Sequence, residues 1–382
     1  MRLLCYEGRK LLGLPVLWGF LVLCLAFNGL LLYQQDELRG WFHQGSALAQ
    51  DLGQRMDADF VQALAQRPRS AYDDAVLETA RQGGNVFETF RLERLCGYYQ
   101  NGVLQHSPWA QEKMEEKYAQ LALRQAHLAE TQAALDLYAG PATQAAHQFL
   151  YGTLFRALTA EGAILGMLGS LFLLGYEGMH RTTLTVYSSR TGRRRLVLVK
   201  LAVGALVAAG LFLLLCAVTL AAYFALWDYR GVWGASVSSQ FNYITEMLVQ
   251  RPFLSWADFT VGGYLVAVVA LGALFCGACA LLAGLVGILT PNVYYAALLL
   301  LLLLLGGTYL QTAAAQGEAW QAYFLLSFQP TATWLNLSGW FTELGLSALT
   351  PWQETKATLL CLGLFAGGGS LSAWAVSRKD VR

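Results

Sequence analysis

Six long apolar runs constrain the fold of this 382-residue sequence more than any other feature. They cover residues 15–33, 157–175, 201–227, 259–289, 294–310 and 357–376. A helix of this length can cross the hydrocarbon core of a bilayer, which is about 30 Å thick. Hydrophobic residues make up 56% of the chain and charged residues 13%, about half the charged share of an average soluble domain. The sequence therefore predicts an all-α polytopic membrane protein with six transmembrane helices.

The segment 34–148, after the first run, is too rich in acids and amides to enter lipid and too long for a simple connection. We expect one helix over 36–66, and a second that begins at Pro108 with Ser107 as its N-cap and ends before Gly140. Apolar residues recur along the second helix at Met114, Tyr118, Leu121, Leu128, Leu135 and Tyr138. We interpret this stripe as the packing core of a helical extracellular domain between transmembrane helices 1 and 2, rather than as a ligand site.

The seven cysteines do not suggest a disulfide framework. Of these, Cys96 alone lies in the segment 34–148, so no internal disulfide is expected there. Cys276 and Cys279 form a C-x-x-C on an apolar run, which favours ordinary packing over metal or redox chemistry. Charged and amide residues follow the first run, instead of a small-residue cleavage site, so we expect that run to remain as a span.

The distribution of charge predicts the topology. The segments 1–12, 175–200, 290–293 and 378–382 together hold 12 basic residues and three acids. Short loops rich in Lys and Arg stay on the inner side, so both chain ends are expected in the cytoplasm. Residues 1–13 then form either a short helix at the inner interface or a frayed basic tail. Residues 290–292 break the helix between the fourth and fifth spans.

Several further expectations concern the membrane region. Gly162 and Gly166 are spaced for close helix contact. Arg156 and Glu161 lie near the outer end of the second span, where they can snorkel, pair with each other, or form a polar lip facing a substrate. Aromatic residues are frequent in the second outer loop, 228–258, and directly before it. We interpret them as a belt at the membrane interface: Trp227, Tyr229, Trp233, Phe241, Tyr243 and Trp256.

The segment 176–200 has the most distinctive pattern. Its 25 residues hold six basic side chains, three of them consecutive at Arg193, Arg194 and Arg195, against a single acid, Glu177. Glu177 follows the end of a span, and an apolar run leads to Lys200 at the start of the next. This order resembles the cytoplasmic loop between the second and third spans of ABC transporter permeases of the ABC-2 type. The positions that carry the resemblance are Glu177, Thr182, Leu184, Ser189, Gly192, Arg193, Leu196 and Lys200.

The six spans and the proline-bearing segment 327–335, which resembles the family's short re-entrant helices, extend the likeness over essentially the whole chain. This sequence departs from the family pattern at His180 and Arg181, where the family often has a glycine. It also departs at Arg190, where the family often has a proline. In that family the loop rests on an ATPase subunit, and the helix at residues 1–13 is a second contact. The resemblance thus implies a coupling role for Glu177, Thr182, Ser189, Arg190, Gly192, Arg193, Arg194, Arg195 and Lys200.

The resemblance further implies a bacterial exporter subunit in the cell membrane, with domains at 1–33, 34–148 and 149–382. Its partners would be an ABC ATPase subunit, a second copy or related permease, and membrane lipid, with no nucleic acid. The sequence has no G-x-x-x-x-G-K-[ST], H-E-x-x-H or G-x-S-x-G motif, so we expect no catalytic residue, metal or cofactor in this chain, with ATP bound by the partner.

One alternative stays open: a membrane sensor or scaffold whose outer domain binds a ligand. Six glycine-rich spans exceed what an anchor needs, which favours the permease. A co-purifying ATPase or kinase would distinguish the two.

Overall fold

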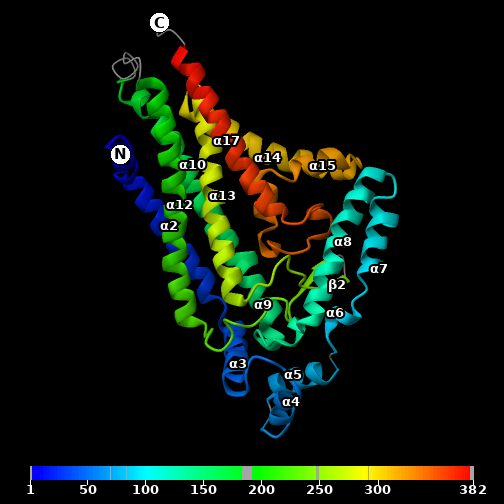
Figure 1. Ribbon diagram of the computed structural model, residues 1–382. Coiled ribbons are helices and arrows are strands. Elements are labelled where there is room, and N and C mark those ends of the chain that lie inside the picture. Colours follow the sequence, from blue (N-terminus) through cyan, green and yellow to red (C-terminus); the bar gives the residue numbers. More distant parts are fainter. Residues whose placement is uncertain are drawn as a thin grey trace.

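The computed structural model describes residues 2–68, 70–82, 84–182, 192–246, 249–290 and 292–378. In this part of the chain six helices are long and apolar enough to cross a membrane, as the sequence predicts. They are α2 (Pro15–Tyr33), α10 (Phe155–Met179), α12 (Gly192–Leu226), α13 (Val261–Leu289), α14 (Val293–Gln316) and α17 (Gln353–Arg378). The short helix α1 (Arg2–Leu12) precedes them, as expected. It lies at the same end of the bundle as the end of α17, which we call the basic end; the opposite end is the domain end (Figure 1).

Helices α10, α12 and α13 pack against one another and form the centre of the bundle, with α2 and α17 at their sides. Gly162 of α10 lies so close to α12 that an added Cβ would be 2.9 Å from the Cβ of Phe212. Gly166 approaches Ala208 of α12 even more closely. The prediction that these two glycines allow close helix contact is confirmed, and any larger side chain would push the helices apart.

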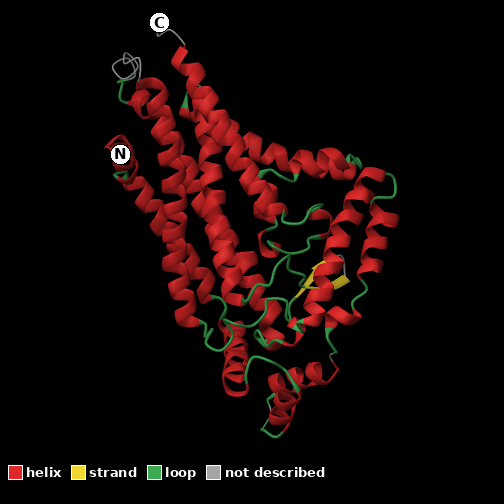
Figure 2. Ribbon diagram, in the orientation of Figure 1, coloured by secondary structure: helices red, strands yellow, loops and turns green. Residues whose placement is uncertain are grey.

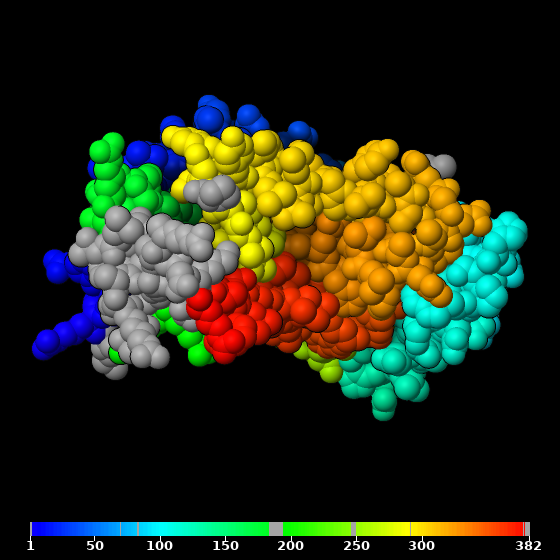
Figure 3. Space-filling model, turned by 90° about the horizontal axis from the view of Figure 1, so that it is seen from above, coloured from blue at the N-terminus to red at the C-terminus, as the bar shows by residue number. Residues whose placement is uncertain are grey.

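Helix α14 stands apart from this centre. The Asn292 side chain accepts a hydrogen bond from the Tyr294 N–H (2.9 Å) and caps the helix, so the expected break between α13 and α14 is confirmed. Helix α14 then runs obliquely away from the bundle toward α15 (Trp320–Leu326), and forms with it a ridge on the molecule seen from the basic end (Figures 1 and 3). Its most apolar stretch is 11% buried within the chain, so most of its leucines are exposed on the surface of this chain.

The segment between α2 and α10 is helical, as predicted, but it is divided differently. Its elements are α3 (Asp36–Leu52), α4 (Ala58–Ala65), α5 (Ala71–Gln82), α6 (Val86–Thr89), α7 (Leu92–Tyr98), the π-helix η1 (Tyr99–Val103), α8 (Pro108–Glu130), the 3₁₀ turns η2 (Ala133–Leu135) and η3 (Gly140–Ala142), α9 (Thr143–His147) and the π-helix η4 (Gln148–Leu154). The expected helix over 36–66 is interrupted at Gly53, which has φ +97°. Helix α8 ends at Glu130 instead of near residue 139, because Gln132 takes a left-handed conformation with φ 52°.

The start of α8 and its apolar stripe match the prediction. The Ser107 hydroxyl accepts a hydrogen bond from the Ala110 N–H (3.4 Å), with Pro108 in the first turn. Stripe residues that lie on α8 are buried: Met114, Tyr118, Leu121 and Leu128. Leu254, Trp320 and Leu349 complete their cluster from other parts of the chain. The core of the α6–α8 region is therefore shared with the segments that follow α12 and α14.

The segment between α12 and α13 contains the two strands of the described structure, which the all-α prediction did not include (Figure 2). Strands β1 (Tyr243–Glu246) and β2 (Val249–Pro252) pair antiparallel, with Ile244 opposite Arg251. The interpretation of the local aromatic residues as an interfacial belt is wrong for Trp227 and Tyr229. Both rings are buried against Phe42 of α3, so they fasten the domain end instead of facing a membrane surface.

Short helices follow α14, as expected for the segment 327–335. They are α15, α16 (Pro330–Leu335) and the 3₁₀ turns η5 (Leu337–Gly339) and η6 (Gly345–Ser347).

The Trp334 Nε1–H donates to the Arg156 carbonyl, and the Arg156 guanidinium donates to the Leu335 carbonyl, both at 2.9 Å. Glu161 instead accepts a hydrogen bond from Asn28 of α2 (2.8 Å). Arg156 and Glu161 thus bind different partners and do not pair with each other.

A buried ion cluster joins α8, β2 and the segment before η6. We call Lys117, Arg251 and Glu343 the Glu343 cluster. The Lys117 ammonium lies 2.8 Å from one carboxylate oxygen of Glu343, and the Arg251 guanidinium binds the other. Lys117 also donates to the main-chain carbonyls of Gly345 and Ala348, at 2.7 Å each. All three charged side chains are at most 3% exposed, so each depends on its partners for solvation.

The electrostatics of this cluster determine its response to pH. Burial by itself raises the pKa of Glu343, but the positive charges of Lys117 and Arg251 outweigh it and hold that pKa below its ordinary value of 4.5. A carboxylate with a depressed folded-state pKa contributes stability above its unfolded value. That contribution is lost as the pH falls through the folded-state pKa.

Replacing Glu343 with glutamine should therefore loosen α8, because Lys117 and Arg251 lose the charge that neutralises them. Breaking a buried pair in this way costs about 3–5 kcal/mol. We expect faster amide hydrogen exchange along α8 in the full chain, measured by mass spectrometry. The exposed pair Lys113–Glu116 provides the control: Glu116→Gln should leave exchange unchanged.

Equal exchange in the Glu343→Gln and Glu116→Gln variants would contradict this role. The wild-type chain should lose this stabilisation as the pH falls from 4.5 through the lower folded-state pKa of Glu343, and α8 should then exchange faster once intrinsic rates are corrected.

Candidate functional site

The segment that the sequence singles out lies at the basic end, and its two flanking charges meet there. Glu177, near the end of α10, and Lys200, in α12, form an ion pair. Lys200 also donates a hydrogen bond to the Leu173 carbonyl. The Glu177 side chain is 6% exposed and that of Lys200 is 2% exposed. Their charges therefore face the protein interior, not a solvent-filled surface.

Helix α1 completes this site from the other end of the sequence. The Lys10 ammonium lies 3.3 Å from the second carboxylate oxygen of Glu177 and 2.7 Å from Glu7. The same ammonium stacks over the ring of Tyr176, 4.5 Å from its centroid. We call Glu7, Lys10, Glu177 and Lys200 the Glu177 cluster. Its two acids and two bases are balanced, and they tie α1, α10 and α12 together.

Sequence reasoning counted Glu7 and Lys10 as charges but missed their contact with Glu177. The sequence indicates only that Glu7 and Lys10 can pair with each other, because residues three apart on a helix share a face; it does not indicate Glu177 as a partner. Partial burial by itself lowers the pKa of Lys10, but hydrogen bonds and charge attraction from Glu7 and Glu177 raise it above its ordinary value. Lys10 therefore stays charged throughout the physiological pH range.

The expected loop over 176–200 is shorter than predicted. Helix α10 continues to Met179, and α12 begins at Gly192, so both flanks of the segment are helical. Arginine, leucine and lysine are good helix formers, and a helical start lets Leu196 and Val197 pack inward. The described flanks of the segment are thus two helix ends, and residues 183–191 lie outside the described part of the chain.

The remaining predicted coupling residues occupy different environments. Arg194 and Arg195 are exposed in the first turn of α12, which also includes Gly192 and Arg193. Thr182 is exposed, and its main-chain N–H donates to the Glu177 carbonyl (2.9 Å). Ser189 and Arg190 lie outside the described residues. Among the described side chains, the predicted set therefore divides into a buried pair, Glu177 and Lys200, and the exposed residues Thr182, Arg194 and Arg195.

A cavity of about 540 Å³ opens beside the Glu177 cluster. It is bounded by the end of α10, the start of α12 and the α13–α14 turn, and its lining includes Glu177, Met179, Val197, Thr290 and Tyr294. The α13–α14 turn is packed closely onto α10 here, because an added Cβ on Gly175 would collide with Val293. Movement of the end of α10 would therefore act on the α13–α14 turn as well.

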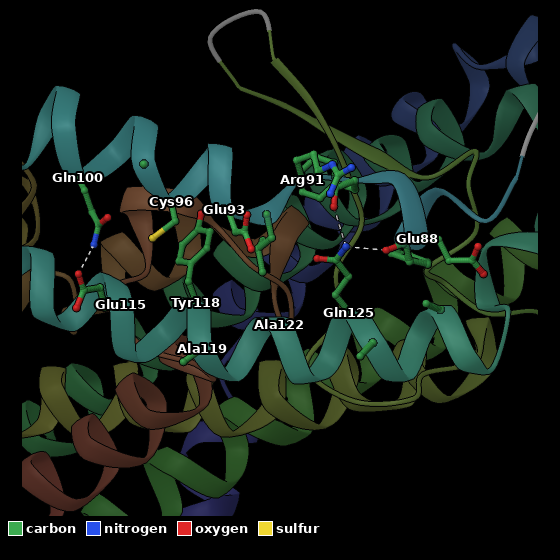
Figure 4. Close-up of a pocket in the computed structure, with 16 residues that line it drawn as sticks. Glu88, Arg91, Glu93, Cys96, Gln100, Glu115, Tyr118, Ala119, Ala122 and Gln125 are labelled. Carbon is green, nitrogen blue, oxygen red and sulfur yellow. Dashed lines mark hydrogen bonds between the residues drawn. The ribbon is translucent and has the colours of Figure 1, made fainter.

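A second hollow, of about 710 Å³, lies between α6–α7 and α8 (Figure 4). The Gln125 amide crosses from α8 to donate to the carbonyls of Phe87 (2.6 Å) and Phe90 (2.9 Å). Gln100 donates to Glu115 (2.9 Å) at the other end of the groove. These bonds hold the two layers together, which agrees with the interpretation of α8 as a packing element.

No protein-family model, no curated protein and no solved structure matches this chain.

Glu177→Gln should destabilise the basic end, because Lys200 would remain buried without its counter-charge. The expected cost is about 3–5 kcal/mol, seen as a lower midpoint of thermal unfolding in lipid nanodiscs. Lys10→Met should cost less, since the pair between Glu177 and Lys200 stays intact. Arg194→Gln is the control and should unfold like the wild type, because its side chain is exposed. A Glu177→Gln variant as stable as Arg194→Gln would contradict the role of the cluster.

Proposed function

We propose that this chain is the membrane-spanning permease subunit of an ATP-driven exporter of the ABC-2 type. It forms a translocation pathway with a second permease chain, and a separate ATPase subunit binds ATP and supplies the energy. The observation that carries the proposal is the construction of the basic end. Exposed arginines start α12, and directly behind them the Glu177 cluster joins that helix to α10 and α1.

This construction suits an element that receives force from a partner. A connection between two spans transmits movement only if it does not yield, and buried ion pairs fix the relative position of the helices that bear them. Because the cluster binds α1, α10 and α12, a displacement at the start of α12 would move three helices together. The α13–α14 turn, packed on α10, would follow.

The proposal assigns different roles to the residues of the segment. Glu177 and Lys200 are positioning residues, because their charges neutralise each other inside the protein. Arg194 and Arg195 are docking residues, because exposed charges at an interface set its register and orientation. Thr182, Ser189, Arg190, Gly192 and Arg193 belong to the docking part of the segment in this scheme. The basic end then faces the cytoplasm, as its excess of Lys and Arg favours.

Reversing the charge of both docking residues, Arg194→Glu with Arg195→Glu, should uncouple ATP hydrolysis from transport while leaving the chain folded. We expect substrate-stimulated ATPase activity of the reconstituted complex to fall about tenfold or more, since repelled charges across an interface cost several kcal/mol. Unfolding midpoints of the permease alone should stay unchanged, because both side chains are exposed.

The control for this experiment is Arg378→Glu at the end of α17. Arg378 is an exposed arginine at the same end of the bundle, stacked 3.7 Å above the ring of Trp374. If the arginines acted through attraction to anionic lipid headgroups alone, each would contribute about 1 kcal/mol and the three positions would behave alike. Full coupling in the Arg194→Glu/Arg195→Glu variant would refute the docking role.

The proposed orientation has its own test. A cysteine introduced at position 189 should be labelled by an impermeant maleimide from the inner side of the membrane, and one at position 105 from the outer side. Cys5 is exposed and Cys96 partly so, and both must first be replaced by serine; the other five cysteines are buried. Labelling of position 189 from outside would reverse the arrangement.

A further inference from the structure

A polar cavity of about 400 Å³ lies at the domain end, apart from the Glu177 cluster. It is enclosed by α9 and η4, by strand β1, and by the turn that contains Ser338. Its volume falls within the range of small-molecule sites, about 300–1,000 Å³. A water molecule occupies about 30 Å³ in the liquid, so the cavity is much larger than a single buried water needs.

His147 on the wall of this cavity lacks partners. Its side chain is 3% exposed, and neither ring nitrogen makes a hydrogen bond within the described part of the chain. The backbone of Ser338 interacts with the ring, but this contact is not a well-aligned hydrogen bond to either ring nitrogen. The rings of Tyr151, Phe253 and Tyr264 surround it, with centroids 4.6, 4.6 and 5.4 Å away. A buried polar group without a partner costs about 1–3 kcal/mol, so this histidine is unfavourable for stability alone.

The rest of the lining defines the chemistry of a ligand. Amide and hydroxyl side chains predominate: Gln144, Gln148, Asn242, Tyr243, Thr245 and Ser338. No Asp, Glu, Lys or Arg is among the described residues that line the cavity. A charged ligand would find no counter-ion there, whereas an uncharged ligand with several hydrogen-bonding groups would be satisfied.

The local backbone is built to present one of these groups. Gln148 begins the π-helix η4, a rare form that occurs frequently at functional sites. Its side chain folds over Gly152, where any Cβ would collide with the Gln148 amide. Gln148 is exposed and Thr245 beside it is exposed, so the cavity opens to the surface between them.

We propose that this cavity, the His147 site, binds a neutral carbohydrate. A sugar hydroxyl both donates and accepts, so it can pair with either nitrogen of a neutral imidazole and with both ends of a glutamine amide. The apolar C–H face of a sugar ring packs against aromatic and aliphatic walls, here Phe253, Ile244 and Leu344. Binding at the His147 site does not depend on transport and goes beyond the proposed permease function.

The test uses the full chain in nanodiscs that contain no glycolipid and were prepared without glycoside detergent, since such detergents carry sugars themselves. The protein is applied to an array of neutral and charged glycans, with an array of uncharged peptides beside it. We expect binding to neutral glycans. Gln148→Ala and Gly152→Ala, which remove and displace the same amide, should each weaken it about three- to tenfold, the effect of one hydrogen bond. Gln100→Ala, in the distant α7–α8 groove, should bind like the wild type.

His147→Phe separates a binding role from a structural one. Phenylalanine keeps the shape of the ring and removes the two unpartnered nitrogens, so the ligand-free variant should unfold at a higher temperature than the wild type. It should also lose binding to the glycans. A lower unfolding temperature would mean that His147 stabilises the fold, and unchanged glycan binding would mean that it is not part of the site.

The source of the sugar is decided by a final comparison. Each bound glycan is presented once as a free oligosaccharide and once as the headgroup of a glycolipid in the nanodisc. Binding in either form supports the site and identifies its source. Binding to peptides alone, or to nothing on either array, would overturn the proposal and leave a cavity filled by water.

Discussion

A charge removed from water must be matched by other charges and donors nearby, and this chain meets that requirement twice, at opposite ends of its helical bundle. At the basic end Glu177 binds Lys200 and Lys10; at the domain end Glu343 binds Lys117 and Arg251. Each carboxylate joins three segments that are far apart in the sequence. Helices such as α13 are apolar all round, and lipid tails are as apolar as leucine, so hydrophobicity alone does not fix how such helices pack. The two carboxylates, together with close contacts at Gly162 and Gly166, supply that specificity.

The features that sequence reasoning predicted well are local ones. A span depends on the composition of one continuous run, and the start of α8 depends on Ser107 and Pro108 alone. The features it missed depend on distant residues. Lys10 and Glu177 are 167 positions apart, and nothing near either one indicates the other. Helix α8 ends early because Gln132 takes a left-handed conformation. The apolar stripe continues to Tyr138, so the sequence gives no sign of this end. Trp227 and Tyr229 follow a span, which predicts a place at a membrane surface. Their burial against Phe42 depends on the fold of α3, and the residues around them do not indicate it.

The candidate site shows how one sequence pattern can have two causes. An acid at the end of one span, a lysine at the start of the next and arginines between them were all interpreted as contacts to an ATPase. The geometry explains the acid and the lysine without any partner, since they neutralise each other inside the bundle. The arginines at 194 and 195 have no such internal explanation, because they are exposed. The proposed coupling function therefore depends on the exposed arginines, while Glu177 and Lys200 determine how firmly those arginines are held.

Helix α10 belongs to both ends of the molecule. Together with η3, α9 and η4 it forms one helical stretch from Gly140 to Met179, with His147 near its start and Glu177 near its end. Gly166 and Gly162 hold its middle against α12 without space for sliding. Tight packing along the middle favours movement of α10 as a unit with α12, and the π-helical turns of η4 leave a less regular segment at the domain end. A displacement of the basic end would then reach η4, and the His147 site at its start, through α10 itself.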